Sequence, residues 1–153
     1  MADQNDDTTR SLRRPGSDPV PRIVLDTDAL VAAAYAERSA SRQILEGCLR
    51  QAVQAVISPA LHREYQYIVK RAVRGRDFSD LFRRFLEKAK VVEPVGTPRV
   101  VPDDPDDDKL VAAALSGAAD AIVTNDHHLL ILDPYGQLRI VRPAEFVGLW
   151  LER

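Results

Sequence analysis

Short apolar runs alternate with longer amphipathic segments along most of the chain. The first run, residues 23–25, contains only Ile, Val and Leu, and similar runs occupy residues 53–57, 91–92, 121–124 and 138–141. Runs of this length, rich in β-branched residues and poor in polar ones, are typical of strands buried on both faces of a parallel sheet. The pattern therefore predicts a strand at each of these places.

The segments between these runs repeat apolar residues at the spacing of a helix. The clearest case follows Ser58-Pro59, because serine is a common helix cap and proline fits the first helical position. Leu61, Tyr65 and Val69 then recur on one face. The predicted helices span residues 28–36, 41–51, 59–72, 78–86, 105–118 and 143–151, with Asp28, Ser41 and Asp104 as further caps.

This alternation of strands and helices predicts an α/β fold, in which helices cover both faces of a central, mostly parallel sheet. Ligands of such sheets bind beyond the carboxyl ends of the strands, close to a switch in strand order. If the connections are regular and right-handed, strand ends and helix starts meet at that same edge. Polar side chains at those positions are therefore the first candidates for a functional site.

The domain organisation is simple. Residues 1–21 are polar and interrupted by prolines, so we expect a disordered N-terminal tail, followed by one domain over residues 22–153. The whole chain has 153 residues, 45% of them hydrophobic, which suits one domain with a proper core. No apolar stretch approaches the roughly 20 residues that cross a bilayer, and a cytoplasmic location without membrane association is expected.

Charge is distributed unevenly along the chain. Between His62 and Lys90 there are nine Lys or Arg and four Asp or Glu, which gives this segment a charge of +5. Because the net charge of the whole chain is −2, the remainder carries −7. A basic segment beside an acidic region suits a protein that both holds and cuts a polyanion such as RNA, although a solvated helix face has the same composition.

Carboxylates gather at the predicted strand ends and helix starts. Asp26 and Asp126 follow predicted strands, and Glu64 lies in the second turn of the helix that opens at Ser58-Pro59. Asp107 and Asp108 lie in the first turn of another predicted helix, where either one can face the sheet. Carboxylates collected at one edge would repel one another unless a divalent cation lay between them, so the pattern predicts a metal-dependent phosphate chemistry.

Taken in order, these segments resemble the PIN-domain ribonucleases, and more closely the branch of VapC-like toxins from toxin–antitoxin pairs. The likeness extends over about residues 22–149. The segments that carry it are Leu25-Asp26-Thr27-Asp28, Ser58-Pro59 through Glu64, Asp104-Pro105-Asp106-Asp107-Asp108 and Thr124-Asn125-Asp126. Each motif is weak alone, and the ordered set is specific.

The resemblance implies a three-layer α/β/α sandwich and hydrolysis of single-stranded or structured RNA with Mg²⁺ or Mn²⁺. It also implies a cognate antitoxin protein as partner, and homodimers are common among such proteins. The acidic ligands that it implies are Asp26, Glu64, Asp126 and one of Asp107 and Asp108. The general toxin pattern favours Asp108, because two aliphatic residues follow the ligand, whereas the paired aspartates of the closer branch favour Asp107.

Two positions depart from the family pattern. Asp28 stands where the family usually has Asn, which adds negative charge near the metal site. The sequence Asn125-Asp126-His127-His128 replaces the more common Gly-Asp and the charged pair after it. Both departures bear on metal affinity and leave the predicted fold unchanged.

Two other functions compete with the nuclease. The pair Asp26 and Asp28 after an apolar strand resembles the start of haloacid-dehalogenase-like phosphatases, in which the first Asp is phosphorylated. There a Thr or Ser motif and a Lys precede the second acidic pair, whereas here Asp107 and Asp108 precede Thr124. The other alternative is a catalytically weak PIN-like binding module, which the presence of all four acidic positions disfavours.

Overall fold

The computed structural model describes residues 20–95 and 108–152 of the chain. The predicted tail, apart from Val20 and Pro21, lies outside these residues, and so does the predicted helix start at Asp104 and Pro105. At the beginning of the described part, the carbonyl of Pro21 accepts a hydrogen bond from the backbone N–H of Gln54 at 2.8 Å. The backbone therefore contacts the sheet immediately before the first strand.

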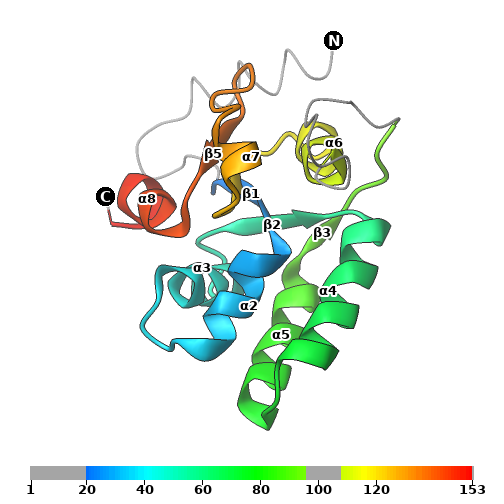
Figure 1. Cartoon of the computed structure of the whole chain (residues 1–153), viewed down its shortest axis with the longest axis vertical. Helices are drawn as coiled ribbons and strands as arrows, with labels where there is room; N and C mark the ends of the chain where they lie inside the picture. Colours follow the sequence, from blue (N-terminus) through cyan, green and yellow to red (C-terminus); the bar gives the residue numbers. More distant parts are fainter. Residues whose placement is uncertain (1–19, 96–107, 153) are drawn as a thin grey trace.

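A sheet of five parallel strands forms the centre of the molecule, as the alternating pattern predicted (Figure 1). The strands lie in the order β3-β2-β1-β4-β5, and every neighbouring pair is parallel. Their bounds are β1 Arg22–Leu25, β2 Gln54–Ile57, β3 Lys90–Val91, β4 Ala121–Val123 and β5 Arg139–Val141. The fold is thus α/β, with helices flanking an all-parallel sheet, as the sequence predicted.

Helices cover both faces of this sheet (Figure 1). The helices between residues 27 and 88 lie on one face, and those at residues 108–116 and 127–130 lie on the other, as right-handed connections require. Among the described residues, no helix is both long and apolar enough to cross a membrane. The helices are α2 Thr27–Tyr35, α3 Ala40–Leu49, α4 Pro59–Ala72, α5 Arg76–Lys88, α6 Asp108–Ser116, α7 His127–Leu130 and α8 Pro143–Phe146, which a π-helical turn, Val147–Leu151, continues.

Local capping explains where the helices begin. Ser58 accepts a hydrogen bond from the N–H of Leu61 at 3.2 Å, and Pro59 follows at the first helical position, as the sequence predicted. The predicted cap of the next helix upstream was wrong. Ser39, not Ser41, caps α3 by accepting from the N–H of Arg42 at 3.1 Å, while Ser41 is buried inside the helix.

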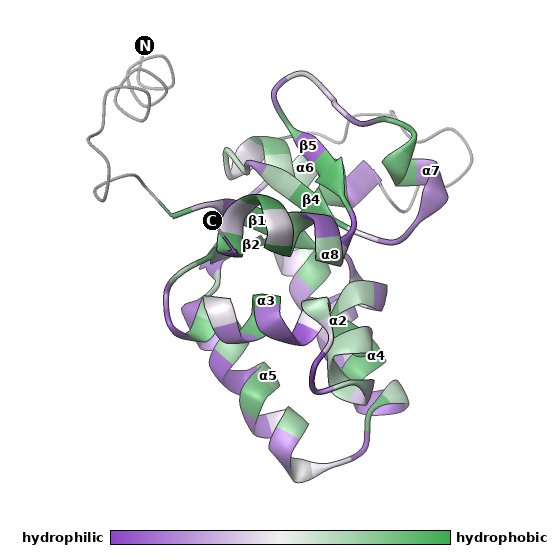
Figure 2. Ribbon diagram, turned by 90° about the vertical axis from the view of Figure 1, so that its left-hand side faces the viewer, coloured by the Kyte–Doolittle hydropathy of each residue, from purple (hydrophilic) through white to green (hydrophobic). Residues whose placement is uncertain are grey.

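The core lies between the sheet and the two helical layers. Hydrophobic residues dominate the strands and the inward faces of the helices in Figure 2, and polar residues lie outside. All three residues of β4 are completely buried. On α5 the rings of Phe78, Phe82 and Phe85 are also buried, so the apolar face of this helix belongs to the core. A strand that is buried on both faces has a fixed position, which makes its end a rigid support for a site.

The strand order creates a switch point between β1 and β4. The chain begins at the centre with β1, adds β2 and β3 on one side, and then crosses to place β4 on the other side of β1. Connections leave the ends of β1 and β4 toward opposite faces, which opens a crevice there, and this is where open α/β sheets bind ligands. Asp26 follows β1 directly and Thr124 follows β4 directly.

Gly117 fixes the distance between the end of α6 and the sheet. A Cβ atom at this position would lie 2.4 Å from Cγ1 of Val56 in β2, closer than two carbon atoms can approach. We therefore expect Gly117→Ala to lower the free energy of unfolding by about 2 kcal/mol, because the added methyl must displace a buried strand side chain. Chemical denaturation measures this difference.

Gly148→Ala is the matched control for this substitution. A Cβ at Gly148 has no neighbouring atom within 4 Å, and the residue lies in the helical C-terminal turn. Its replacement should leave stability unchanged or raise it by about 0.5 kcal/mol, because alanine restricts the unfolded chain. Equal stability of the two variants would contradict the close approach of α6 to β2.

Candidate active site at the switch point

Asp26 is the central residue of the site. Its backbone N–H continues the sheet by donating to the carbonyl of Val123 at 2.9 Å, and the whole residue is only 8% exposed. The hydroxyl of Thr124 donates a hydrogen bond to its Oδ2 at 2.6 Å. The two central strand ends thus hold one buried carboxylate between them, directly at the switch point.

Thr124 also connects this carboxylate to a second one. Its Oγ1 accepts a hydrogen bond from the backbone N–H of Asp126 at 2.9 Å, so the hydroxyl donates toward Asp26 and accepts from the Asp126 backbone. The side chain of Asp126 caps α7 by accepting from the N–H of His128 at 2.9 Å. Asp126 therefore has a structural role as well as a position beside Asp26.

The electrostatic environment disfavours the charged form of Asp26. Burial raises the pKa of its carboxyl group above the ordinary value of 3.8, and the hydrogen bond from Thr124 partly offsets this increase. The negative charges of Asp28 and Asp126 raise the pKa further. Positive charge brought to this point would relieve both the burial penalty and the repulsion.

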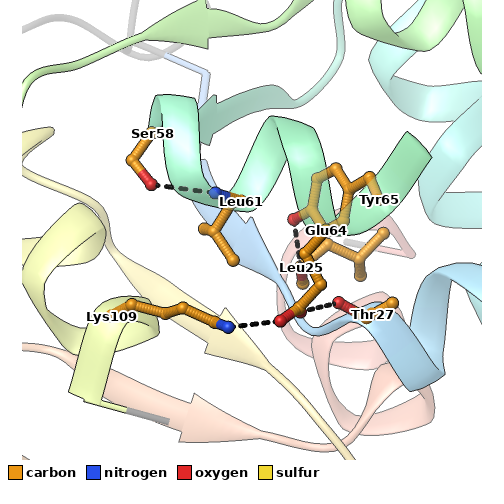
Figure 3. A network of polar contacts seen from close by, with 7 residues as sticks. All are labelled: Leu25, Thr27, Ser58, Leu61, Glu64, Tyr65 and Lys109. Atoms are coloured by element: carbon orange, nitrogen blue, oxygen red, sulfur yellow. Dashed lines mark hydrogen bonds and ion pairs between the residues drawn. The ribbon is translucent and has the colours of Figure 1, made fainter. Parts of the chain in front are cut away.

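Glu64 approaches the same edge from α4 (Figure 3). Its carboxylate accepts a hydrogen bond from the hydroxyl of Thr27, the residue after Asp26, and forms an ion pair with the ammonium group of Lys109 on α6. The Glu64 side chain is 29% exposed. Three helices on two faces of the sheet, α2, α4 and α6, therefore meet at this carboxylate.

Tyr65 attaches α4 to the central strand. The ring is fully buried, and its hydroxyl donates to the carbonyl of Leu25, the last residue of β1 (Figure 3). Burial raises the pKa of the Tyr65 hydroxyl far above its usual range, so the group remains a proton donor at any ordinary pH. Because Glu64 precedes Tyr65, this hydrogen bond also fixes the position of Glu64 relative to Asp26.

The remaining predicted acidic residues have separate outcomes. Asp108 is buried, at 3% exposure, in the first turn of α6, and the next residue, Lys109, reaches Glu64. Asp107 lies outside the described residues. The prediction that Asp28 caps α2 was wrong, because Asp26 occupies the cap position while the exposed Asp28 lies in the first helical turn.

The donor atoms at this edge suit a hard divalent cation. Oxygen atoms are the ligands that Mg²⁺ and Mn²⁺ prefer, and the burial of Asp26 together with the repulsion from Asp28 and Asp126 favours added positive charge. Over residues 20–95 and 108–152, no three Asp, Glu, His or Cys side chains already form a metal-binding group. The chemistry of the donor atoms therefore fits the predicted ion. In the structure, the Asp26 carboxylate accepts a hydrogen bond from Thr124. The Glu64 carboxylate is bound by Thr27 and Lys109.

Sequence reasoning did not single out Lys109 or the hydroxyl of Tyr65. A lysine directly after an aspartate run has no distinctive spacing, and it contacts Glu64 only because α6 and α4 converge in space. The helical spacing predicts Tyr65 as a core residue, and its ring is buried as predicted. Its hydroxyl gains importance from the distant Leu25 carbonyl, a contact that local patterns do not encode.

Comparison with known proteins supports the fold and places the chain in a family. A family model described as PIN domain matches residues 22–128, a span that contains every acidic candidate. One similar solved structure is PAE2754 from Pyrobaculum aerophilum, with a TM-score of 0.52 and 22% sequence identity over 92% of this chain and 96% of that one. No curated protein matches the sequence.

Thr124 provides a direct test of how the buried carboxylate is held. We expect Thr124→Val to lower the free energy of unfolding by about 2 kcal/mol, because a hydrogen bond to a charged group is lost at nearly constant volume. The substitution should also raise the pKa of Asp26 further, which a pH titration followed by NMR would measure. Thr124→Ser keeps the hydroxyl and should lose less stability, so equally destabilised variants would contradict this role.

Asp26→Asn tests the cost of burying the charge. The pKa of Asp26 is higher in the folded protein than in the unfolded chain, so protonation of Asp26 stabilises the fold. This stabilisation is fully present below the ordinary pKa of 3.8 and is lost as the pH rises through the pKa of the folded protein. At pH 7 with EDTA, Asp26→Asn should therefore unfold at a higher temperature than the wild type. The difference should shrink as pH falls toward 3.8, and a constant difference across that range of a thermal-denaturation series would contradict the assignment.

Proposed function

This chain belongs to the PIN-domain family, and from that premise we propose that it is an endoribonuclease that requires Mg²⁺ or Mn²⁺. Proteins of this family are typically metal-dependent nucleases. The proposal for this chain depends above all on one observation, the buried carboxylate of Asp26 at the switch point, with Asp28 and Asp126 close enough to raise its pKa. Such a group is costly to keep ionised unless a cation is its partner.

The proposed ligands are Asp26, Glu64, Asp126 and one of Asp107 and Asp108. These residues would hold a divalent ion, which would supply positive charge for the scissile phosphate and for activation of the attacking water. Thr124 orients Asp26, and Thr27 orients Glu64, through the hydrogen bonds described above. Lys109 balances the charge of Glu64 before the ion binds. No side chain of the protein is required as a covalent nucleophile.

The basic segment supports a polyanionic substrate. Its charged residues lie mainly on α4 and α5, and α4 begins beside the acidic site. Arg63 and Lys109 line the same hollow of about 290 Å³, together with Ser58, Pro94 and the acidic Glu93. Lys109 also forms the ion pair with Glu64. Phosphate contacts supply most of the affinity of nucleic-acid proteins, so cations placed around the acids favour RNA over a small phosphate ester.

The finer part of the proposal is that the protein is the toxin of a toxin–antitoxin pair. Its partner would be a small antitoxin that covers the acidic groove and places Arg or Lys against the carboxylates, where charge-assisted hydrogen bonds are strong. Homodimerisation belongs to the same proposal. Copurification of this chain with the product of a neighbouring gene, followed by loss of nuclease activity in the complex, would test it.

The phosphatase alternative loses its basis, because the family match assigns the region from Asp26 to Asp126 to a PIN domain. A catalytically weak binding module is the remaining competitor. It predicts RNA binding without turnover, whereas the nuclease predicts turnover that stops when Asp26 is neutralised. The two functions are therefore separated by one assay.

That assay uses a mixed pool of single-stranded and structured RNAs, incubated with Mg²⁺, Mn²⁺ or EDTA. We expect the wild type to cleave RNA only with a divalent ion, and Asp26→Asn to lose at least about a hundredfold in rate, because the central ligand becomes neutral. His127→Ala, at an exposed position on α7, should retain the wild-type rate.

Folding and metal binding are measured separately from activity. Mg²⁺ should raise the unfolding temperature of the wild type, as any ligand of the native state does, and raise that of Asp26→Asn much less. Absence of cleavage by a folded wild type whose unfolding temperature responds to Mg²⁺ would favour the binding module.

A further inference from the structure

Helix α4 carries a stripe of cationic side chains around one exposed tyrosine. Arg63, Tyr67, Lys70 and Arg71, defined here as the α4 stripe, fall within an arc of about 100° at 3.6 residues per turn. All four are exposed, and Tyr67 keeps 58% of its surface accessible. The guanidinium of Arg71 lies over the Tyr67 ring, 5.0 Å from its centroid. Tyr67 is therefore accessible to a ligand, with cationic side chains on both sides of it.

The α4 stripe begins beside the acidic site. Helices α2 and α4 run side by side in the same direction, because Thr27 bonds Glu64 at one end and the Tyr35 hydroxyl bonds the Ala72 carbonyl at the other. Glu64 adjoins the stripe on the helical surface. From Glu64 to Arg71 the helix rises about 10 Å, which corresponds to about three nucleotides at the stacked spacing of 3.4 Å.

We infer that the α4 stripe binds a single-stranded RNA segment that leads away from the acidic site. A base stacks on the open face of Tyr67, while Arg63, Lys70 and Arg71 contact phosphates. This inference rests on the proposed ribonuclease function and specifies its substrate as an unpaired strand. Aromatic rings bind unstacked bases of any sequence, whereas paired bases keep their faces covered.

The charges of the stripe distinguish an RNA strand from a protein partner. Tyr and Arg are also common in protein interfaces, so the distinguishing feature of the α4 stripe is its three like charges around a single aromatic ring. The one acid on α4, Glu64, is already paired with Lys109. Within residues 20–95 and 108–152, no ion pair engages Arg63, Lys70 or Arg71. Such a cationic row is complementary to a phosphate backbone, and its binding would depend strongly on salt.

The inference is tested by RNA binding in EDTA, where metal-dependent cleavage cannot occur. The probes are a fluorescein-labelled single strand of about ten nucleotides and the same sequence as a duplex, followed by fluorescence anisotropy. Tyr67→Ala should weaken binding of the single strand about tenfold, and Tyr67→Phe should bind as the wild type does because the ring remains. Lys70→Gln should reduce the slope of log affinity against log salt by about 0.7.

Ile131→Ala is the matched control, since Ile131 is 62% exposed at the end of α7 and should not affect binding. Unchanged binding by Tyr67→Ala, or equal affinity of the wild type for duplex and single strand, would overturn the inference. So would a change of oligomeric state in Tyr67→Ala, measured by sedimentation, because the stripe would then be a protein interface. If binding depends on the α4 stripe but the RNA-pool assay shows no cleavage, the result would contradict the proposed ribonuclease function and not the inference about the stripe.

Discussion

The hydrogen bond from Thr124 to Asp26 is the interaction on which the site depends. It joins the ends of the two strands that flank the switch point, and it does so with a hydroxyl and a carboxylate that are both buried. The fold can keep this carboxylate out of water only because the flanking strands are fixed by burial on both faces. A less rigid support would let the charge move to solvent, and the site would lose its geometry.

Charge balance around this point comes from the helices and not from the sheet. Lys109 approaches Glu64 from the opposite face of the sheet, so the ion pair forms only when both helical layers are packed in place. With side chains about one-third exposed on both partners, such a pair adds little to stability. The effect of this ion pair is local, because Lys109 compensates the charge of Glu64 and orients its carboxylate next to Asp26.

The sequence predicts the layers and the strand ends well, because both depend on short-range patterns. Apolar runs located all the strands, and the Ser58-Pro59 signal located the start of α4. Errors arose where neighbouring residues offer the same chemistry, as with Ser39 and Ser41 or Asp26 and Asp28 at helix starts. Contacts such as Lys109 with Glu64 and Tyr65 with Leu25 were missed, since they join distant segments.

A net charge of −2 is compatible with the proposed RNA substrate, because the charges of the chain are separated in space. The acids of the candidate site lie at the switch point, and the α4 stripe leads away from it along α4. A strand that approached the carboxylates alone would be repelled. When neighbouring phosphates of the same strand contact the α4 stripe, their attraction to the cations offsets the repulsion between one phosphate and the acids. A divalent ion would supply the remaining positive charge. The proposed recognition and cleavage of RNA would therefore require the two regions to be adjacent, and the parallel packing of α2 on α4 places them next to each other.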